Sequence, residues 1–331
     1  MQYDITRKRN TGLVRLFNVV TKEMFVFETV GKDLICLRPE MTASTVRAFV
    51  ENNVQTIPWK VFSFGPLFRY ERPQKGRYRQ FHQMNIELIG AASLVHDVQL
   101  ILMLDRFFDE VLHLDAYALC LNYLGCSADR VAYRNYIQQK LYNIDTICDT
   151  CKVRREKNPL RVFDCKNEAC QKEYKMLDAI TDHLCITCAM EWQQIQEQLS
   201  LLSVSFVHNP KLVRGLDYYD KTAFEFVSHN LGAQTAFCGG GRYDSLVHQL
   251  SGKRTEPAIG AAIGIERVLL LLAQKDAKLL PIKKAPLYVL APLEKEQQIV
   301  AQFIADELRH AGMQTDILLD ESSIKQSCCY A

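Results

Sequence analysis

The chain has 331 residues, of which 48% are apolar and 24% are charged. This balance is typical of soluble globular proteins and excludes a disordered, collagen-like or fibrous chain, while the length favours about two domains. The 40 basic and 38 acidic residues leave a net charge of +2, so any nucleic-acid contact requires a local basic patch.

The first predicted elements along the chain are short. Residues 24–28 and 34–37 have the pattern of two strands joined by a turn over 30–33. Pro39 ends the second strand, and Thr42 is placed to cap a helix that runs to about Asn52.

Residues 60–90 are the most informative part of the chain. A strand over 60–71, a loop over 72–78 and a return strand over 79–90 are predicted. Side chains alternate across a strand, so Met84, Ile86 and Leu88 share one face of the return strand, as in a normal core face. Its other face carries three polar side chains in a row: Gln83, Asn85 and Glu87.

The same hairpin is strongly basic. Against one acid, Glu71, residues 60–82 carry Lys60, Arg69, Arg72, Lys75, Arg77 and Arg79. Such a run is commonly a solvated loop tip. However, Arg69 lies on the strand, and the polar face of the return strand runs beside it. These features favour a sheet surface that binds a polyanion next to a small polar molecule.

An amphipathic helix over 97–112 comes next. It is followed by a mostly helical insert over 126–207, with helices over 129–141 and 187–202. Strands are predicted again over 222–229 and 234–238.

Glycines mark the second half of the chain. Gly239–Gly241 is predicted as a turn whose backbone packs closely against a neighbour or a ligand. Gly260 and Gly264 likewise allow a neighbouring segment or a ligand to pack closely against the backbone, at the start of a helix predicted over 262–273. Arg267 near that start opposes the helix dipole, and a bound anion would compensate for it. A β-α-β unit then follows, with strands over 287–290 and 315–319 and a helix over 294–311.

The twelve cysteines are placed unevenly, and six of them fall within 148–188. The longest apolar run is far below the roughly 20 residues of a membrane span, and no export signal is visible. We therefore expect a cytoplasmic protein without membrane contact, in which clustered cysteines indicate a metal site more than disulfides. Two Cys-x-x-Cys pairs with zinc-knuckle spacing predict a structural zinc ion, and free thiols packed as small apolar side chains are the alternative. The predicted ligands are Cys148, Cys151, Cys185 and Cys188.

Several segments, in the same order and spacing, resemble the signature segments of the histidyl-tRNA synthetases. They are residues 37–42, 68–73, 76–83, 212–219, 240–244 and 264–267. The hairpin segments resemble motif 2 and the last segment resembles motif 3 of class II aminoacyl-tRNA synthetases, whereas 212–219 and 240–244 resemble segments peculiar to the histidine enzymes.

The resemblance implies an α+β fold: a class II synthetase-like antiparallel sheet flanked by helices, with a helical insert and the start of a C-terminal α/β domain. On this basis the chain divides into a catalytic core in two parts, the cysteine-rich insert, a linker and an incomplete anticodon-binding domain. Their bounds are 1–125 and 208–277 for the core, 126–207 for the insert, 278–285 for the linker and 286–331 for the last domain.

The resemblance also implies an activity and its site. The family activates L-histidine with ATP and Mg²⁺ and transfers the histidyl group to the 3′ end of tRNA(His), as homodimers. By matching position, Arg69 and Arg214 serve the α-phosphate, and Arg69, Arg77 and Arg267 bind ATP. The histidine ligands, also by position, are Glu40, Thr42 and Gln83 for the ammonium, Glu87 and Tyr219 for the imidazole, and Tyr218 and Arg214 beside them.

The two ends depart from the family pattern. Motif 1, which forms the family's dimer interface, and most of the anticodon-binding domain find no match, and we expect a chain truncated at both ends that activates histidine better than it charges tRNA. Two alternatives are an inactive fragment and a histidine-binding regulatory paralogue of histidine biosynthesis. A paralogue of that kind should lose the ATP-contacting arginines, and this chain keeps them.

Overall fold

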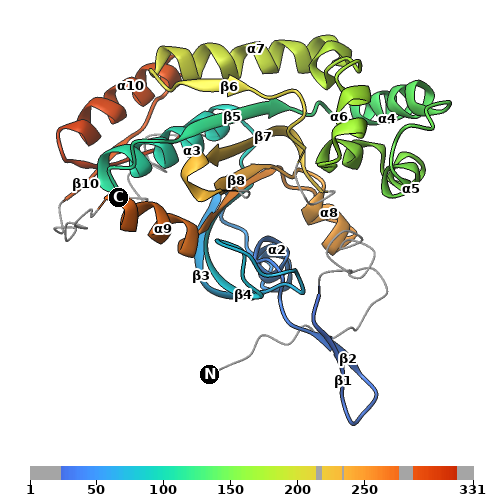
Figure 1. Cartoon of the computed structure of the whole chain (residues 1–331). Coiled ribbons are helices and arrows are strands. Elements are labelled where there is room, and N and C mark those ends of the chain that lie inside the picture. The colour runs from blue at the N-terminus through green and yellow to red at the C-terminus, as the bar shows by residue number, and fades with distance from the viewer. Residues whose placement is uncertain (1–23, 214–217, 233–234, 276–285, 319–331) are drawn as a thin grey trace.

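The computed structural model describes residues 24–213, 218–232, 235–275 and 286–318. Its centre is a seven-stranded sheet in the order β3-β4-β9-β8-β7-β5-β6, antiparallel except for the parallel pair β5 and β6 (Figure 1). Helices cover both faces, which confirms the predicted α+β class. The strands are β3 Trp59–Phe68, β4 Gln80–Ile89, β5 Ala118–Tyr123, β6 Phe206–His208, β7 Asp220–Val227, β8 Ala236–Arg242 and β9 Ala258–Gly264.

One face of the sheet packs against three helices and forms the larger core. They are α3 (Val95–Arg106), α7 (Ile186–Leu201) and α9 (Ile265–Lys275). The apolar side chains of β4 contribute to this core, as their alternation predicted. The π-helical turn η2 (Phe107–Val111) continues α3, so the helix predicted over 97–112 is confirmed with a change of hydrogen-bonding pattern in its last turn.

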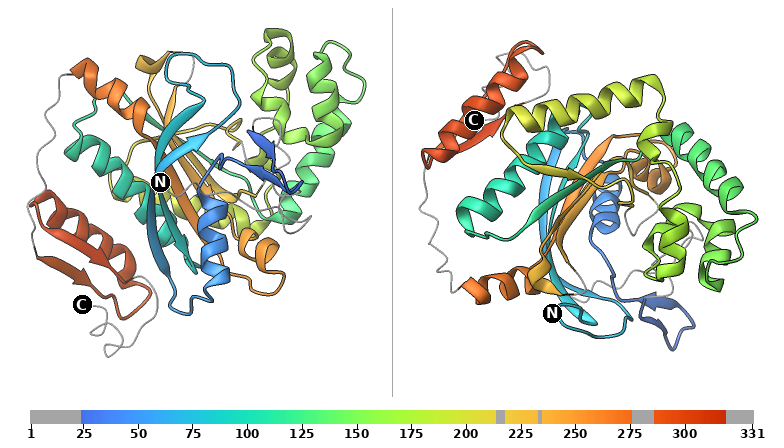
Figure 2. Two further views of the ribbon diagram at one scale, coloured as in Figure 1. Left: turned by 90° about the horizontal axis from the view of Figure 1, so that it is seen from below. Right: turned by 45° about the horizontal axis from the view of Figure 1, so that its top comes forward.

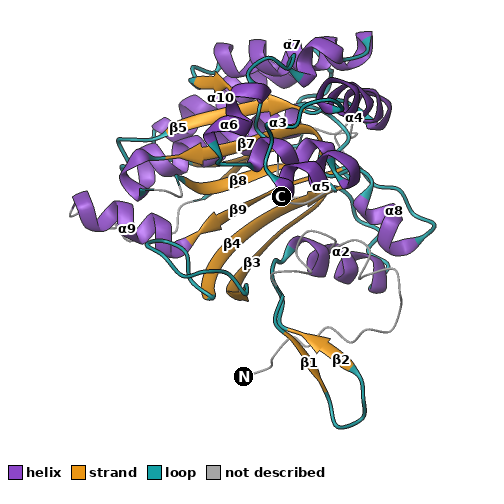
Figure 3. Cartoon of the chain, turned by 45° about the vertical axis from the view of Figure 1, so that its right-hand side comes forward, coloured by secondary structure: helices purple, strands orange, loops and turns teal. Residues whose placement is uncertain are grey.

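The opposite face carries the second core. There α2 (Thr42–Glu51) and α8 (Leu246–Ser251) pack together with the insert, as the right-hand view of Figure 2 and Figure 3 show. The insert contains α4 Ser127–Leu141, α5 Asp149–Lys157, η3 Pro159–Asp164, α6 Glu168–Tyr174 and η4 Ile180–His183.

The last part of the predicted insert packs with the sheet. Helix α7 buries Trp192, Ile195 and Leu199 in the larger core, and β6 pairs with β5. The elements from α4 to η4 therefore form the part that projects over the second face. Neither β5 nor β6 was predicted from the sequence, because β5 is a short buried strand without clear alternation and β6 has three residues.

The glycine run lies inside a strand, so the predicted turn is wrong. Gly240 and Gly241 belong to β8, where a Cβ on Gly240 would lie 2.2 Å from the carbonyl oxygen of Gly260. The predicted close approach to a neighbour is confirmed, because that neighbour is the adjacent strand β9. Similarly, residues 258–264 form β9, and α9 begins at Ile265 and not at 262.

The outlying elements match their predictions. The hairpin of β1 (Val26–Glu28) and β2 (Leu34–Cys36) is antiparallel. Strands β10 (Leu287–Leu290) and β11 (Gln314–Ile317) form a parallel pair joined by α10 (Gln297–His310), which is a β-α-β unit. The predicted linker 278–285 lies outside the described residues. Among the described residues, no helix combines the length and apolarity that crossing a bilayer requires.

Candidate functional site

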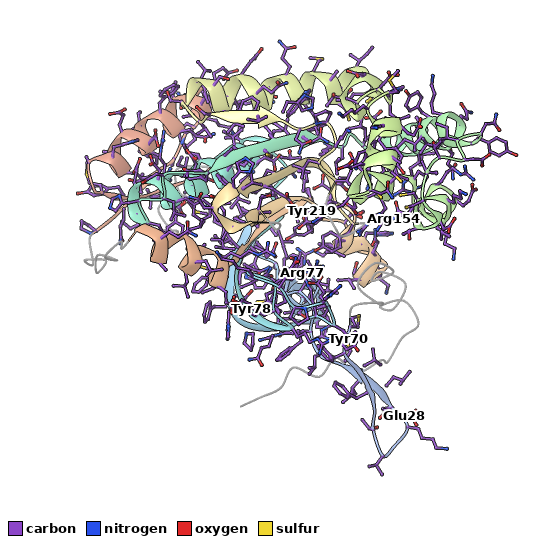
Figure 4. The ribbon with its side chains drawn as sticks, viewed as in Figure 1. Glu28, Tyr70, Arg77, Tyr78, Arg154 and Tyr219 are labelled. Atoms are coloured by element: carbon purple, nitrogen blue, oxygen red, sulfur yellow. The ribbon has the colours of Figure 1, made fainter. Side chains whose placement is uncertain are left out.

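A cavity of about 630 Å³ opens on the polar face of the sheet. This volume lies within the range of small-molecule sites. Its lining comes from β4, the start of α2, the hairpin loop, α9 and the segment before β7, and Figure 4 labels Arg77 and Tyr219 there. The lining includes the following residues that the sequence assigned to substrates: Glu40, Thr42, Arg69, Arg77, Gln83, Tyr218, Tyr219 and Arg267.

Two of the arginines are held in place by backbone carbonyl groups. Arg69 Nε donates to the carbonyl oxygen of Pro39 at 2.9 Å, and its guanidinium lies 5.1 Å from the ring centroid of Phe81. Arg267 Nε donates to the carbonyl oxygen of Gly76, in the hairpin loop, at 2.8 Å. Arg267 also donates from Nη1 to the carbonyl oxygen of Ala236. These contacts fix the direction of each planar guanidinium, whose fork geometry suits arginine to binding phosphate oxygens.

The arginines also crowd one another. Burial, followed by the positive charges of Arg69 and Arg77, lowers the pKa of Arg267 despite the opposing effect of Glu71. Arg77 forms an ion pair with Glu71. Like charges gathered in one cavity are unfavourable until an anion lies among them, so this end of the cavity is suited to a polyphosphate.

The other end of the cavity is a compact polar network. Thr42 donates its hydroxyl hydrogen to Glu87 Oε1 at 2.6 Å, and Glu40 Oε1 accepts from the backbone N–H of Ala43 at 2.9 Å. The prediction that Thr42 caps helix α2 is therefore wrong: Glu40 accepts the amide hydrogen bond at the helix start, and the Thr42 hydroxyl serves the site. Tyr218 Oη lies 3.4 Å from Glu40 Oε2.

Glu87 lies behind the cavity and does not line it. It is 1% exposed, and its second oxygen accepts from Tyr243 Oη at 2.5 Å. Burial, the largest influence, raises the pKa of Glu87 to about 8. A Cβ on Gly260 would lie 1.7 Å from Glu87 Oε2, so glycine at this position makes room for the carboxyl group. Tyr243 was given no role from the sequence, although its motif was recognised.

Arg242 does not belong to the cavity lining, despite its place in the glycine-rich segment. Its guanidinium is 1% exposed and pairs with the fully buried carboxylate of Asp97 at 2.8 Å. It also donates to the carbonyl oxygen of Ala91 at 2.7 Å. This residue therefore ties the first turn of α3 to β8 behind the site.

The insert supplies a basic wall that the sequence analysis did not foresee. Arg154, Arg161 and Lys166 line the same cavity as the substrate residues, and Figure 4 labels Arg154. We call these three residues the insert wall. Their charge was visible in the sequence, but their position depends on how the insert folds back over the sheet.

The cysteines form two groups, not the one that was predicted. Cys148 and Cys151 gather with Cys165 and Cys170, whereas Cys185 and Cys188 gather with Cys126 and Asp129. In each group the possible ligand atoms all lie within 4.8 Å of one another. The predicted set of Cys148, Cys151, Cys185 and Cys188 is therefore wrong as a single site, because its two pairs belong to different helices and different groups.

Arg214, predicted at the α-phosphate, lies outside the described residues. The described residues resume at Tyr218, which lines the cavity.

The sequence of this chain is similar to sequences of known proteins. The family model described as "Histidyl-tRNA synthetase" matches residues 13–268. A relative from Clostridioides difficile (strain 630), named histidine–tRNA ligase, is 46% identical over 258 residues, which are 77% of this chain and 61% of that relative. A relative of the same name from Halothermothrix orenii (strain H 168) is 40% identical over 332 residues, with 99% of this chain and 76% of the relative covered.

Among solved structures, the apo histidyl-tRNA synthetase of S. aureus superposes with a TM-score of 0.65 at 30% identity. The superposition covers 96% of this chain and 77% of that one. The sheet flanked by helices is thus the fold of a class II synthetase. Family match, relatives and structure agree, and the chain belongs to the histidyl-tRNA synthetase family.

Proposed function

We propose that this chain is a histidine–tRNA ligase, which activates L-histidine with ATP to histidyl-adenylate and transfers the histidyl group to the 3′ end of tRNA(His). One observation carries the proposal: an arginine cluster and a polar network that includes Glu40 and Thr42 line the same cavity. The chain spans 61% of the C. difficile relative, so its activity, substrates and partners are put forward here for this chain.

Activation requires the two substrates to lie side by side. The histidine carboxylate attacks the α-phosphorus of ATP, an oxygen–phosphorus bond forms, and the bond to pyrophosphate breaks. Catalysis of this transfer is mainly positioning and stabilisation of the charge on the phosphoryl oxygens. Arg69 is proposed to act on the α-phosphate with Arg214, and Arg77 and Arg267 are proposed to hold the outer phosphates.

The polar network is proposed to bind the amino acid. Glu40, Thr42 and Gln83 offer oxygen acceptors for its ammonium group. Tyr219 lines the cavity and is proposed to contact the imidazole ring. Glu87, buried behind the lining, is proposed to support recognition of the ring through the hydrogen bonds that it accepts from Thr42 and Tyr243. Hydrogen bonding to a ring nitrogen gives strong selectivity, because a competitor without that nitrogen leaves a buried polar group unpaired.

Magnesium is part of the proposal. Mg²⁺ is usually held by one or two carboxylates together with substrate phosphates. Glu225 lines the cavity and lies close enough to Arg267 to oppose the lowering of the Arg267 pKa. Glu225 would hold the ion, which would neutralise charge on the phosphates when bound. We further propose that the protein works in the cytoplasm and forms a homodimer, as the family resemblance implies.

The regulatory alternative gains no support from the site. A protein that only binds histidine has no need of arginines aimed at phosphate. Here Arg69, Arg77 and Arg267 all line the cavity beside the amino-acid residues.

Aminoacylation tests the proposal as a whole. The purified chain, incubated with ATP, Mg²⁺ and a tRNA(His) transcript, should transfer labelled histidine to that tRNA and no other amino acid. A tRNA that carries the wrong acceptor end serves as the control. Histidine binding with neither adenylate formation nor transfer, at any enzyme concentration, would favour the regulatory alternative.

Glu87→Gln should weaken histidine binding by about 1–3 kcal/mol, the cost of leaving a buried polar group poorly paired. The ATP affinity should stay unchanged, since the hydrogen bonds of Glu87 come from Thr42 and Tyr243. Calorimetric titration with each ligand measures both effects. Glu51→Gln, on the exposed end of α2, is the matched control. Equal loss of both ligands in Glu87→Gln would mean that the substitution damages the fold.

The same variant should change how stability depends on pH. The pKa of Glu87 is raised from 4.5 to about 8 in the folded protein, so the folded chain holds this proton more tightly than the unfolded chain does. Its contribution to stability is therefore complete below about pH 4.5 and is lost as the pH rises towards about 8. Thermal melts without ligand should show wild-type stability falling over this range more steeply than that of Glu87→Gln. If the stability of wild type and that of Glu87→Gln fall equally with rising pH, the raised pKa does not belong to Glu87.

A further inference from the structure

The first cysteine group has the geometry of a metal site. The Sγ atoms of Cys148 and Cys165 are 3.9 Å apart, and all four sulfurs of the group lie within 4.8 Å of one another. A tetrahedral zinc ion with zinc–sulfur bonds of about 2.3 Å places its sulfurs about 3.8 Å apart. A disulfide requires about 2.05 Å. The sulfur spacing therefore fits four ligands around a zinc ion better than it fits disulfides.

Backbone amides already point at these sulfurs. Cys170 Sγ accepts from the backbone N–H of Cys148 at 3.2 Å, and Cys165 Sγ accepts from the backbone N–H of Asn167 at 3.4 Å. Hydrogen bonds of this kind, made around the ligand atoms, orient the ligands of a metal site. Basic residues close to the cysteines in sequence offset the net charge of about −2 that four thiolates and Zn²⁺ carry. They are Lys152, Arg154, Arg155 and Lys166.

We propose that Cys148, Cys151, Cys165 and Cys170 bind one structural zinc ion and that this ion braces the insert wall against the substrate cavity. The ion would join the start of α5, the end of η3 and the middle of α6. Cys151 and Cys170 are fully buried, and four protein ligands leave no open position, so the site is structural and not catalytic.

The second group does not need a metal. Both carboxylate oxygens of Asp129 accept backbone hydrogen bonds, from Cys126 at 3.1 Å and from Cys185 at 3.0 Å. Burial tends to raise the pKa of Asp129, but hydrogen bonds from Cys188, Cys126 and Cys185 outweigh the effect of burial and lower that pKa. This carboxylate joins the starts of α4 and α7 by itself, so the chain should bind one zinc ion and not two.

The zinc ligands are continuous with the insert wall. Arg154 lies three residues after Cys151 and donates to the carbonyl oxygen of Arg161 at 3.1 Å. Arg161 in turn pairs with Asp164, next to Cys165, at 3.2 Å. Loss of the ion should therefore loosen the wall. This consequence rests on the proposed function, because it requires a substrate that carries phosphate.

Metal analysis of the full chain, purified under reducing conditions, tests the site without any substrate. Wild type should contain about one zinc ion per chain. Cys165→Ser and Cys170→Ser should lose it, Cys165→His should keep it because imidazole also binds zinc, and the matched control Cys185→Ser should keep it. Cobalt substituted for zinc should give the intense visible and near-ultraviolet bands of tetrahedral thiolate coordination. Circular dichroism should show that each variant folds.

Three results would overturn the metal site. The first is loss of zinc in Cys185→Ser with retention in Cys165→Ser. The second is metal-free wild type with all thiols titratable after unfolding. The third is metal-free wild type with fewer titratable thiols, which would indicate disulfides.

Binding measurements test the bracing separately. Cys165→Ser should weaken binding of ATP, of tRNA(His) or of both, by about tenfold, and Cys185→Ser should weaken neither. Separate titrations with ATP and tRNA show which phosphates the wall contacts. Zinc loss with unchanged affinity for both would overturn the bracing. A chain that binds zinc as predicted but never binds ATP or histidine would instead refute the proposed function.

Discussion

Arg69→Ala should lower the rate of histidyl-adenylate formation by roughly 10²–10³, the loss seen when one preorganised donor to a developing charge is removed. Arg69 is fixed by the carbonyl oxygen of Pro39 and by the Phe81 ring, so its guanidinium needs little reorganisation during the reaction. Single-turnover kinetics at saturating ATP and histidine measure the effect.

A matched control separates this effect from a general loss of positive charge. Arg79, on the same hairpin, lies over the Tyr70 ring at 4.9 Å and does not line the cavity. Arg79→Ala should therefore leave the rate nearly unchanged. An Arg69→Ala enzyme with a raised KM for ATP and an intact maximal rate would show that Arg69 binds the ground state and does not act on the transition state.

Asp97→Ala should destabilise the protein by about 3–5 kcal/mol, the cost of leaving a buried charge without its partner. Arg242 would then stay buried with only the partly exposed Asp244, 3.1 Å away, to compensate its charge. Urea unfolding monitored by tryptophan fluorescence measures the change.

The double variant Asp97→Leu with Arg242→Met supplies the comparison. It replaces the ion pair with apolar side chains of similar size, and such replacements are often neutral or stabilising. Its stability should therefore exceed that of Asp97→Ala. If both variants unfold at the same urea concentration as wild type, the pair does not hold α3 to β8.

Alternation along one strand predicted much of the site. Once 79–90 was assigned as a strand, Gln83, Asn85 and Glu87 had to share a face, and Gln83 and Asn85 do line the cavity. Periodicity also placed the buried face of α7, because side chains at helical spacing reach the core whatever the tertiary arrangement. These predictions depend on local geometry, which the sequence determines directly.

Contacts between distant segments were harder to predict. Spacing identified two Cys-x-x-Cys pairs, but it does not say which pairs meet, and the structure unites Cys148 and Cys151 with Cys165 and Cys170. The glycine run was taken for a turn because glycine favours turns, whereas close packing between strands was the cause here. The insert wall depends on the path of a whole helical unit, which no local pattern encodes.

The most direct test of the account is histidine-dependent exchange of labelled pyrophosphate into ATP by the purified chain. Exchange requires reversible formation of histidyl-adenylate, and it needs neither tRNA nor any contact beyond the cavity. We expect exchange that depends on histidine and Mg²⁺, is absent with the other amino acids, and falls by roughly 10²–10³ in Arg69→Ala. A folded chain that binds histidine and ATP but shows no exchange would contradict it.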